Sequence, residues 1–447
     1  MSIFRAYDIR GLYPGEVNEE LAEALGKAFG TYLNKGSAQI AVGGDVRLST
    51  PSLARSLVRG LLSTGARVTD LGMVPTPALY FAVASLGLDG GMVVTASHNP
   101  KEYNGFKPVG KQGVCLSWDT GIREIKEILD AGSFRSGKGT LKAKDISSAY
   151  TTHLTGKVSL KKKLRVVVDA GNGACGRIAP AVFSQLGCDT IPLYCEPDGR
   201  FPNHEADPVK KKNLAALQEK VRETGAGLGV AYDTDGDRLG VVDEQGNIVE
   251  SSTIFSLFIQ GALARRPGSP VVYEVVVSKA VEDTIRSSGG KPVLSRVGHS
   301  FIQAALTQHG AVLGGENSGH YYFPENFGYD DAIFASLKIA ELASSTPLSQ
   351  LSQSVPRYLT SEELRPVCPD ERKFAVVESL QKRFAKEGHS VNTLDGARVT
   401  LERGWFIIRA SNTAPQLVVR WEAQDRASFK AAEALVRNAL KGEGVSL

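Results

Sequence analysis

The sequence lacks the features that mark membrane, secreted and disulfide-linked proteins. None of its apolar runs reaches the ~18 residues that a membrane-spanning helix needs. Its N-terminus carries Arg5, Asp8 and Arg10 where a signal peptide would need an apolar stretch. Its five cysteines form no CxxC pair, which argues against a disulfide framework and against a zinc site. We therefore expect a cytoplasmic protein that contacts no membrane and keeps its cysteines reduced.

The sequence also has little excess of either charge. Its 52 Lys and Arg residues against 48 Asp and Glu residues leave a formal net charge of +4, spread along 447 residues. Proteins that bind nucleic acids usually carry a concentrated basic surface instead. We therefore expect no nucleic-acid partner, whereas a small anionic substrate is compatible with this charge.

Short apolar runs and helical patterns alternate along the chain. A helical periodicity through residues 21–33 precedes a strand-like run at 39–42, which ends in the turn GGDVR, and a second helical pattern continues through 53–61. The same order of strand, turn and helix recurs at 165–173 and again around 272–279. This order is typical of parallel strands covered by helices, whose functional loops follow the carboxyl ends of the strands.

Three polar stretches, at residues 133–150, 251–253 and 361–371, are candidate domain boundaries. The predicted domains are an α/β domain at 1–150, a second at 151–252, a third at 253–363 and a smaller α+β domain at 364–447. In the last domain, alternating strand patterns precede a helix that we expect Gly442 to cap.

The sequence GMVVTASHNP places a polar turn directly after an apolar run. Ser97 lies at the end of this predicted strand, beside His98. A serine hydroxyl in that position suits a covalent nucleophile or a carrier of a phosphoryl group. Taken alone, however, Ser-His-Asn-Pro is a common turn sequence, and the neighbouring motifs have to decide between the two interpretations.

The segment DTDGDR contains three alternating aspartates, Asp233, Asp235 and Asp237. Alternate residues share a face, and three carboxylates on one face repel one another unless a cation lies between them. Oxygen ligands alone indicate Mg²⁺ rather than zinc. An acidic surface loop is the plainer alternative. A calcium EF-hand is disfavoured, because Arg238 stands where that loop needs glycine.

The segment VLGGENSGHYYF also ends a predicted strand in a polar turn. It presents Glu316, Asn317, Ser318 and His320. Carboxylate and hydroxyl groups are natural partners for the vicinal hydroxyls of a sugar, although a turn with satisfied hydrogen bonds has the same composition.

The segment IIRASNTAPQLVVRWEA forms a turn between two predicted strands. Arg409, Ser411, Asn412 and Thr413 occupy this turn. A guanidinium offers bidentate hydrogen bonds to a phosphate, and hydroxyls with turn amides supply neutral donors. A capped hairpin turn is the alternative interpretation.

A fifth motif favours a different class of protein. Gly171, Gly173 and Gly176 form GxGxxG after a predicted strand, and the acidic Glu196 follows the next apolar run. This is the dinucleotide-binding fingerprint, so an NAD-dependent oxidoreductase is the alternative function. That reading leaves Ser97 and the aspartates without a role.

Taken together, the motifs resemble those of the α-D-phosphohexomutase superfamily, and most closely its bacterial phosphomannomutase/phosphoglucomutase branch. The resemblance spans the chain, through FRAYDIRG at 4–11, TASHNP at 95–100, DTDGDR at 233–238, GENSGH at 315–320 and RASNT at 409–413. It implies a Mg²⁺-dependent isomerase that interconverts hexose 1-phosphate and hexose 6-phosphate, of mannose and/or glucose, through a phosphoserine and a hexose 1,6-bisphosphate. It also implies three similar α/β domains with mixed, largely parallel sheets and a smaller C-terminal α+β domain around a central active-site cleft.

The resemblance further implies a role for each matching residue. The implied catalytic residues are Ser97, His98, Arg10 and Lys107. The implied metal ligands are the phosphate on Ser97 with Asp233, Asp235 and Asp237. The implied substrate-binding residues are Tyr7, Arg238, Lys279, Gly298, His299, Glu316, Ser318, His320, Arg409, Ser411, Asn412 and Thr413. The four domains would then carry, in order, the phosphoserine, metal-binding, sugar-binding and phosphate-binding loops.

Three positions depart from the family pattern, and they bear mainly on the choice of sugar. Thr234 replaces a glycine, and Asn317 replaces a methionine in a way that also resembles phosphoglucosamine mutases. Val276 lies where a basic residue is frequent, which leaves Lys279 as the nearest cation. The candidates for the residue that accepts the proton of the attacking hydroxyl are Lys107, His98, His299 and His320. A monomer and a small homo-oligomer are both compatible with the sequence, as is a third class, a sugar-phosphate-binding protein without catalysis.

Overall fold

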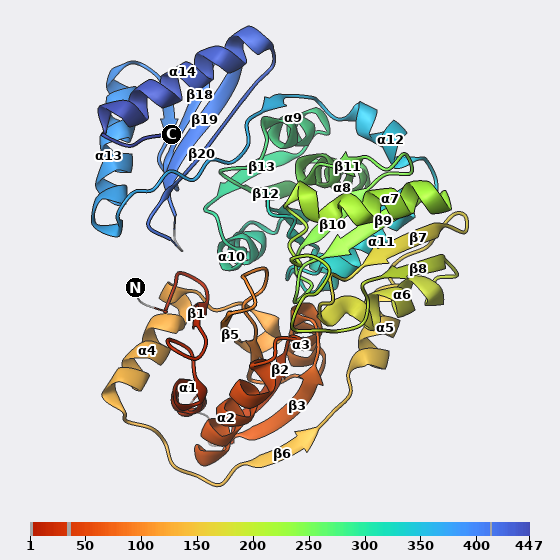
Figure 1. Cartoon of the computed structure of the whole chain (residues 1–447), viewed down its shortest axis with the longest axis vertical. Coiled ribbons are helices and arrows are strands. Elements are labelled where there is room, and N and C mark those ends of the chain that lie inside the picture. The colour runs from red at the N-terminus through yellow and green to blue at the C-terminus, as the bar shows by residue number, and fades with distance from the viewer. Residues whose placement is uncertain (1–2, 34–36, 412–413) are drawn as a thin grey trace. The chain divides into compact units, whose positions relative to one another are not determined.

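The structure is a computed structural model that describes residues 3–33, 37–411 and 414–447. The chain folds into two compact units, each made of two separate stretches (Figure 1). Unit 1 contains Met1–Ile254 and Ser318–Ser352, and unit 2 contains Phe255–Asn317 and Gln353–Leu447.

The first sheet of unit 1 has six strands in the order β1-β5-β4-β2-β3-β6. The strands are β1 (Ile9–Leu12), β2 (Gln39–Gly44), β3 (Arg67–Met73), β4 (Gly90–Val94), β5 (Tyr103–Val109) and β6 (Thr140–Ala143). The helices of this region are α1 (Glu19–Tyr32), α2 (Thr50–Ser63), α3 (Thr76–Ser85) and α4 (Ile122–Ala131). Strands β4, β2, β3 and β6 run parallel, and β5 pairs antiparallel with both β4 and β1. Ser97 follows the carboxyl end of β4 and therefore lies next to β5.

The second sheet of unit 1 has five strands in the order β11-β10-β9-β7-β8. The strands are β7 (Arg165–Asp169), β8 (Asp189–Leu193), β9 (Leu228–Tyr232), β10 (Leu239–Val242) and β11 (Ile248–Val249). The other elements of this region are α5 (Ser147–Thr155), α6 (Ile178–Gln185), α7 (Ala215–Thr224), β15 (Tyr321–Tyr322), α11 (Ala332–Ala343) and α12 (Leu348–Leu351). Strands β8, β7 and β9 run parallel, whereas β10 turns back antiparallel to β9. The turn between β9 and β10 carries the three aspartates.

Unit 2 contains a parallel α/β region and an antiparallel C-terminal region. The chain enters it along α8 (Ser251–Arg265). The parallel strands β12 (Pro270–Glu274), β13 (Lys291–Ser295) and β14 (Leu313–Gly315) accompany α9 (Lys279–Ser287) and α10 (His299–His309). The C-terminal strands are β16 (Leu359–Thr360), β17 (Ser390–Asn392), β18 (Ala397–Leu401), β19 (Gly404–Ala410) and β20 (Leu417–Ala423), with helices α13 (Asp370–Lys386) and α14 (Arg426–Gly442).

The C-terminal sheet has the order β16-β20-β19-β18-β17, and its two helices cover one face (Figure 1). On that face, alternate residues such as Phe406 and Ile408 join the hydrophobic cluster with both helices. On the other face, Trp405 and Ile407 pack against Val276 of the parallel region. The predicted fold class is thus confirmed, because mixed and mostly parallel α/β sheets precede a C-terminal antiparallel sheet.

One predicted helix end is wrong. We expected Gly442 to cap the last helix, but α14 runs through Gly442, and Gly444 instead adopts the left-handed conformation, with φ of 69°. The later turn lets Val445 reach the hydrophobic cluster of the C-terminal region, where it is buried. Among the described residues, no helix is both long and apolar enough to cross a membrane.

Candidate active site

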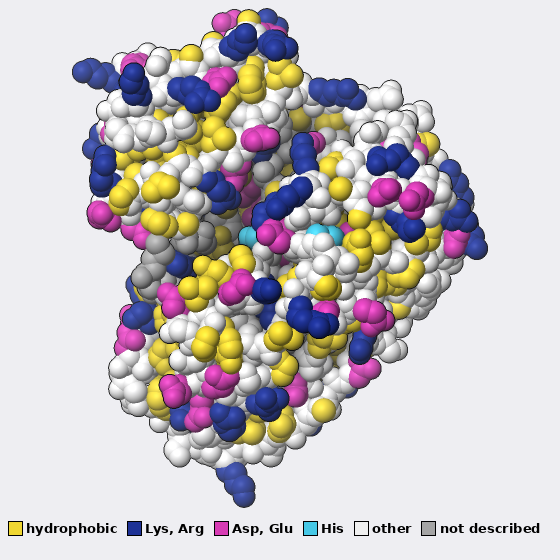
Figure 2. All heavy atoms as spheres, viewed as in Figure 1, with side chains coloured by type: hydrophobic (Ala, Val, Ile, Leu, Met, Phe, Trp, Pro, Cys, Tyr) yellow, Lys and Arg dark blue, Asp and Glu magenta, His cyan; other side chains and the backbone are white. Residues whose placement is uncertain are grey.

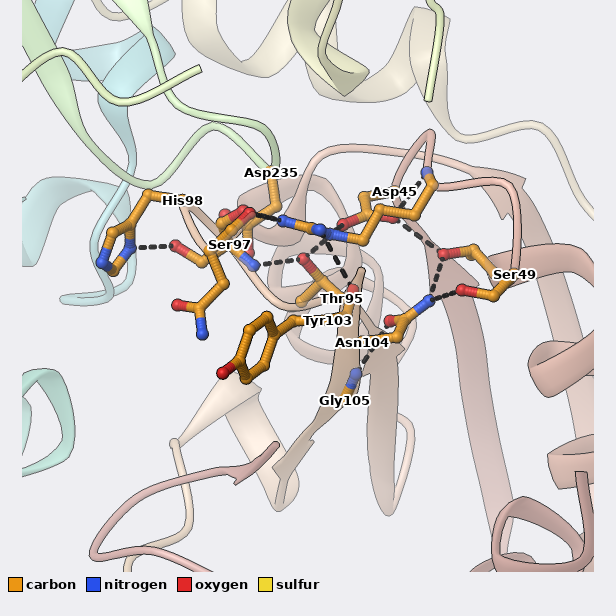
Figure 3. Close-up of polar contacts among 12 residues, drawn as sticks. Asp45, Ser49, Thr95, Ser97, His98, Tyr103, Asn104, Gly105 and Asp235 are labelled. Atoms are coloured by element: carbon orange, nitrogen blue, oxygen red, sulfur yellow. Dashed lines mark hydrogen bonds and ion pairs between the residues drawn. The ribbon is translucent and has the colours of Figure 1, made fainter. Parts of the chain in front are cut away.

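Ser97 adopts a strained conformation three residues after the end of β4. Its φ is 49°, in the left-handed region, and its exposed fraction is 1%. A residue other than glycine in this region costs about 1 kcal/mol or more, so the surrounding structure has to hold it. Part of that hold is visible in Figure 3, where the Ser97 amide donates to Thr95 Oγ1 at 2.9 Å. The direction of the Ser97 side chain is therefore fixed by its backbone.

The Ser97 hydroxyl connects the two sheets of unit 1. It donates a hydrogen bond of 2.8 Å to Asp233 Oδ2 and lies 3.3 Å from His98 Nδ1. Burial and the nearby cations Arg238 and Arg10 keep the pKa of His98 well below its usual value. The imidazole beside Ser97 is therefore neutral at neutral pH. Two motifs that lie 136 residues apart in the chain thus meet at this hydrogen bond.

The turn between β9 and β10 gathers three buried carboxylates. Asp233, Asp235 and Asp237 are at most 2% exposed, and carboxylate oxygens from all three lie within 4.8 Å of one another. The turn wraps around Asp233, whose Oδ1 accepts backbone hydrogen bonds from Gly236, Asp237 and Arg238 at 3.0, 3.1 and 3.2 Å. Burial and the charges of Asp237 and Asp235 raise the pKa of Asp233 well above its ordinary value. The site thus carries a surplus of negative charge that is costly without a cation.

Lys107 on β5 supplies one positive charge to these carboxylates. Its ammonium donates to Asp235 Oδ2 at 2.7 Å and also contacts Asp237. Burial opposes the charge on Lys107, but the two aspartates outweigh burial and raise the pKa of the ammonium. Lys107 is therefore positively charged in this arrangement.

The three aspartates fit a hard divalent cation. Asp235 Oδ1 is buried and finds no hydrogen-bond partner among the described residues, so one ligand atom is available. Carboxylate oxygens are the donors that Mg²⁺ prefers. Residues 239–242 form β10, which confirms that they are a strand and not part of a calcium loop.

His320 and Arg10 lie close to the same cluster. His320 Nε2 is 3.1 Å from Asp237 Oδ1, and its Nδ1 is 2.8 Å from Ser318 Oγ. Arg10, on β1, donates to Asn99 Oδ1 at 3.1 Å, in the loop that carries Ser97. Tyr7 precedes β1 and is partly buried. The structure thus groups most of the unit 1 residues that the sequence indicated.

In unit 2, a carboxylate pair lies at the ends of two neighbouring parallel strands. Glu316 follows β14 and is 4% exposed, and Glu274 ends β12 and is 1% exposed. Glu274 Oε1 accepts the amide of Asn317 at 2.7 Å. Burial and the charge of Glu316 raise the pKa of Glu274 well above its ordinary value. Sequence reasoning missed Glu274, although an acidic residue at a strand's carboxyl end was a usable signal.

Arg409 is held by an aspartate that also contacts another predicted loop. Its Nε and Nη2 donate to Asp395 at 3.3 and 3.1 Å. Asp395 Oδ2 also accepts the amide of Val297 at 2.9 Å, next to Gly298 and His299 at the start of α10. Within unit 2, Asp395 therefore joins the two loops. Asp395 was not foreseen from the sequence.

The remaining predicted residues are Lys279 and those of the turn from Ser411 to Thr413. Lys279 begins α9 and pairs with Asp283 on the same helix at 2.9 Å. The Ser411 carbonyl accepts from Lys373 at 2.7 Å. Asn412 and Thr413 lie outside the described residues.

The glycine motif after β7 packs against the protein itself. A Cβ on Gly173 would lie 2.8 Å from the Thr234 carbonyl, and a Cβ on Gly176 would lie 1.9 Å from the Cys195 carbonyl. The amide of Ala174 also donates to the Thr234 carbonyl at 2.8 Å. Gly173 thus allows close contact with the aspartate turn and Gly176 with the backbone of Cys195, and this packing accounts for both glycines without a dinucleotide.

Four domain families match the chain in order. They are described as phosphoglucomutase/phosphomannomutase alpha/beta/alpha domains I, II and III, at residues 1–136, 148–246 and 250–358, and the C-terminal domain, at 363–439. Together they cover most of the chain. It belongs to the phosphoglucomutase/phosphomannomutase family. The family predicted from the motifs is thus confirmed.

Relatives match over nearly their whole length. A phosphomannomutase/phosphoglucomutase of Pseudomonas putida is 40% identical, with 98% of this chain and 95% of the relative covered. A phosphoglucomutase of Neisseria gonorrhoeae is 38% identical, with 96% and 94% covered. A solved structure of a phosphoglucomutase/phosphomannomutase family protein from Burkholderia thailandensis superposes with a TM-score of 0.92 at 36% identity, covering 98% and 97% of the two chains. The predicted enzyme class, an isomerase, is confirmed.

Each of the four matched domains contributes at least one polar loop to the candidate residues. Ser97 lies in domain I, Asp233 in domain II, Glu316 in domain III and Arg409 in the C-terminal domain. Each of these loops directly follows or ends a strand.

Proposed function

We propose that the enzyme interconverts hexose 1-phosphate and hexose 6-phosphate, of mannose and/or glucose, through a phosphoserine at Ser97. The observation that carries the proposal is the buried Ser97 hydroxyl, 2.8 Å from one of three clustered aspartates. A hydroxyl in this place suits a phosphoryl carrier, because a bound cation and fixed positive side chains stabilise the charge that spreads over the phosphoryl oxygens. The similarity to enzymes named for mannose and glucose supports this choice of sugars.

In the proposed first half-reaction, phospho-Ser97 donates its phosphoryl group to the free hydroxyl of the bound hexose phosphate. A bond forms between the sugar oxygen and phosphorus, and the bond between phosphorus and Ser97 Oγ breaks. The hydroxyl proton passes to a basic side chain, for which neutral His98 is well placed. His299 and His320 are the other candidates, whereas Lys107 already carries its proton.

The Ser97 oxygen takes up a proton as it leaves, so the first half-reaction gives a hexose 1,6-bisphosphate and a free Ser97 hydroxyl. The bisphosphate then turns, and Ser97 Oγ forms a bond to its other phosphorus while the bond between that phosphorus and the sugar oxygen breaks. The Ser97 hydroxyl loses its proton in this step, and the sugar oxygen takes one up. The isomeric hexose phosphate leaves, and phospho-Ser97 is restored for the next substrate molecule.

We propose Mg²⁺ as the cation, held by Asp233, Asp235 and Asp237 with the phosphate on Ser97. When bound, Mg²⁺ supplies positive charge to the phosphoryl oxygens. Arg10, Lys107 and Arg238 add fixed positive charges from the chain itself.

We assign the binding of the sugar to Glu316 and Ser318, which would form hydrogen bonds with its hydroxyls. We assign the binding of the phosphate that is not reacting to Arg409. Lys279, Gly298, His299 and the turn from Ser411 to Thr413 complete the proposed set. Because the substrate is a charged phosphosugar, we place the reaction in the cytoplasm.

A glucosamine phosphate is the second candidate substrate, favoured by Asn317. The backbone N–H of Asn317 donates to Glu274 Oε1 at 2.7 Å, which holds the main chain at this position next to Glu316. A coupled assay with mannose 1-phosphate, glucose 1-phosphate and glucosamine 1-phosphate separates the candidates. Turnover of none of the three would favour a binding protein without catalysis, and saturable micromolar binding of NAD would revive the oxidoreductase alternative.

Ser97→Ala tests the phosphoserine. We expect no mutase turnover with any substrate, because a methyl group cannot carry a phosphoryl group. Ser49→Ala is a matched control, since the Ser49 hydroxyl accepts from Asn104, whose amide also donates to Thr50. This control should keep its turnover. Substantial mutase activity in folded Ser97→Ala would falsify the role of Ser97.

A further inference from the structure

We propose that Arg47 is a positioning residue for this reaction, because its guanidinium holds the backbone of residues 97–103 and thereby fixes the direction of Ser97. The inference rests on the proposed role of Ser97. It concerns a side chain to which the sequence motifs assign no function. Arg47 lies in the turn after β2, and its exposed fraction is 1%.

The guanidinium of Arg47 uses all five of its N–H donors inside the protein. Its Nε donates to Asp45 Oδ2 at 3.1 Å. Its Nη2 donates to the carbonyls of Ser97 and Asn99, both at 2.6 Å, and its Nη1 to those of Pro100 and Tyr103, at 2.7 and 3.0 Å. Three of the five bonds therefore end on the loop that carries Ser97, and a fourth ends on Tyr103, the first residue of β5.

This set of bonds requires arginine. The planar fork of a guanidinium directs its donors at two separate pairs of carbonyls, whereas a lysine has three donors on a single atom. Because these carbonyls face a buried side chain, a carbonyl that loses its donor stays unsatisfied or moves toward another partner. A substitution of Arg47 should therefore shift the loop. Arg47 does not itself bind a phosphate, because each of its five N–H donors already has an acceptor within the protein.

The carbonyl and the amide of Ser97 are both linked to the Asp45 carboxylate, each through one other residue. Its carbonyl accepts from Arg47, and its amide donates to Thr95 Oγ1, which in turn donates to Asp45 Oδ2 at 2.7 Å. Asp45 also accepts from the amide of Arg47 at 2.9 Å. Figure 3 shows part of this arrangement, with Thr95 between Ser97 and Asp45.

This arrangement explains how Ser97 keeps a left-handed conformation that its side chain disfavours. Released from Arg47 and Asp45, Ser97 would relax toward an ordinary turn, and its hydroxyl would swing away from Asp233. A phosphoryl group carried on that hydroxyl would lose its alignment with the substrate. The binding of the substrate itself does not involve Arg47.

Arg47→Lys tests this inference through the separation of kcat from KM. We expect kcat to fall roughly ten- to a hundredfold, because a displacement of about 1 Å in a reacting group has this effect. KM for hexose 1-phosphate should stay within about twofold of the wild-type value, since the substrate contacts are unchanged. A purely structural role would lower Tm and leave kcat of the folded enzyme unchanged.

Leu57→Ala is the matched control, because Leu57 is fully buried on α2 and packs in the hydrophobic cluster of the first sheet. It should lower Tm while kcat, measured below Tm, stays at the wild-type value. Folded Arg47→Lys with kcat within twofold of wild type, or with a rise in KM alone, would overturn the inference.

If Arg47→Lys does not fold, Thr95→Val tests the same arrangement from the amide side of Ser97. Its kcat should fall at an unchanged KM, and a wild-type kcat would overturn the inference. The wild-type enzyme and Ser97→Ala are assayed beside these variants. An inactive wild type, or an active Ser97→Ala, contradicts the proposed function itself and is thereby distinguished from a failure of the Arg47 inference.

Discussion

The candidate residues are mostly polar groups buried at a high electrostatic cost. Asp233, Asp235 and Asp237 are withdrawn from water, and Lys107 is the cation that contacts two of them directly. Three carboxylates beside one ammonium leave negative charge uncompensated, and a protein tolerates this where a cation or a charged ligand completes the site. The cluster is therefore better explained by binding and chemistry than by stability.

Removal of divalent cations tests this reading. Activity should disappear in excess chelator and return on addition of Mg²⁺, because the three aspartates provide the oxygen ligands that Mg²⁺ prefers. Thermal unfolding measured in parallel should show a folded protein in chelator, since Lys107 and the backbone amides around Asp233 still hold the turn. Full turnover in excess chelator would exclude the metal assignment.

Some of these residues could be predicted from the sequence and others could not, for a physical reason. Ser97 and the aspartates follow apolar strands directly, and a polar residue at a strand's carboxyl end is visible in the local pattern. Arg47 and Asp395 act on backbone groups 50 and 98 residues away in the chain, respectively. A backbone carbonyl or amide has no identity in a sequence, so its side-chain partner leaves no motif.

At the scale of elements, the continuous apolar runs predicted the strands well. The runs at 39–42 and 165–169 became β2 and β7, and the helical pattern at 53–61 became α2. The glycine motif after β7 was ambiguous, because a pyrophosphate and a neighbouring backbone both need a residue without Cβ. The structure decides between binding a pyrophosphate and packing against backbone, because the Thr234 carbonyl occupies the space next to Gly173.

Helix α11 begins at a buried carboxylate whose protonation should affect stability. Asp331 accepts from the Phe334 amide, from Tyr150 and from Asn326, at 2.9, 2.8 and 2.9 Å. Burial raises the pKa of Asp331 to about 6, against the effect of these hydrogen bonds. Because the unfolded chain has the lower value, near ~3.9, the folded protein binds this proton more tightly. The resulting stabilisation is complete below about pH 4 and is lost as the pH rises through about 6.

Asp331→Asn removes this titration. Its stability relative to the wild type should rise between pH 4 and pH 7, by up to about 3 kcal/mol, and the difference in Tm measures the change. Asp425→Asn is the control, because Asp425 caps the N-terminus of α14 and the hydrogen bond from the Ser428 amide lowers the pKa of Asp425. The difference in Tm between Asp425→Asn and the wild type should stay nearly constant from pH 4 to pH 7. A constant difference for Asp331→Asn would show that Asp331 does not titrate in this range.

At the scale of the whole molecule, the order of the four domains was predictable, whereas the division into two units was not. The division depends on contacts between distant segments, such as the 2.7 Å hydrogen bond between Tyr232 of β9 and Ser336 of α11. Within unit 2, buried Glu422 similarly accepts from Ser278 and Trp405. The predicted boundaries at 150, 252 and 363 therefore remain predictions. Figure 2 shows basic and acidic side chains interspersed over the visible surface, in keeping with the small net charge.

The proposed reaction also makes a demand on the molecule as a whole, because one sugar must present each of its ends to Ser97 in turn. The phosphate that is not reacting is then the C6 phosphate in one half-reaction and the C1 phosphate in the other. Arg409, 5% exposed and oriented by Asp395, is assigned to this phosphate. The assignment therefore predicts that the loss of Arg409 weakens the binding of both hexose phosphates.

Arg409→Ala should lower kcat/KM roughly ten- to a hundredfold in the forward and the reverse direction, since a charge-assisted contact contributes about 1.5 to 3 kcal/mol. The Mg²⁺ dependence should stay unchanged. Arg403→Ala is the matched control, because this substitution removes the same charge from an exposed position. Arg403 lies between β18 and β19 and pairs with Asp425. Kinetics with hexose 1-phosphate and hexose 6-phosphate measure both directions. An unaltered kcat/KM would show that another residue binds the phosphate that is not reacting.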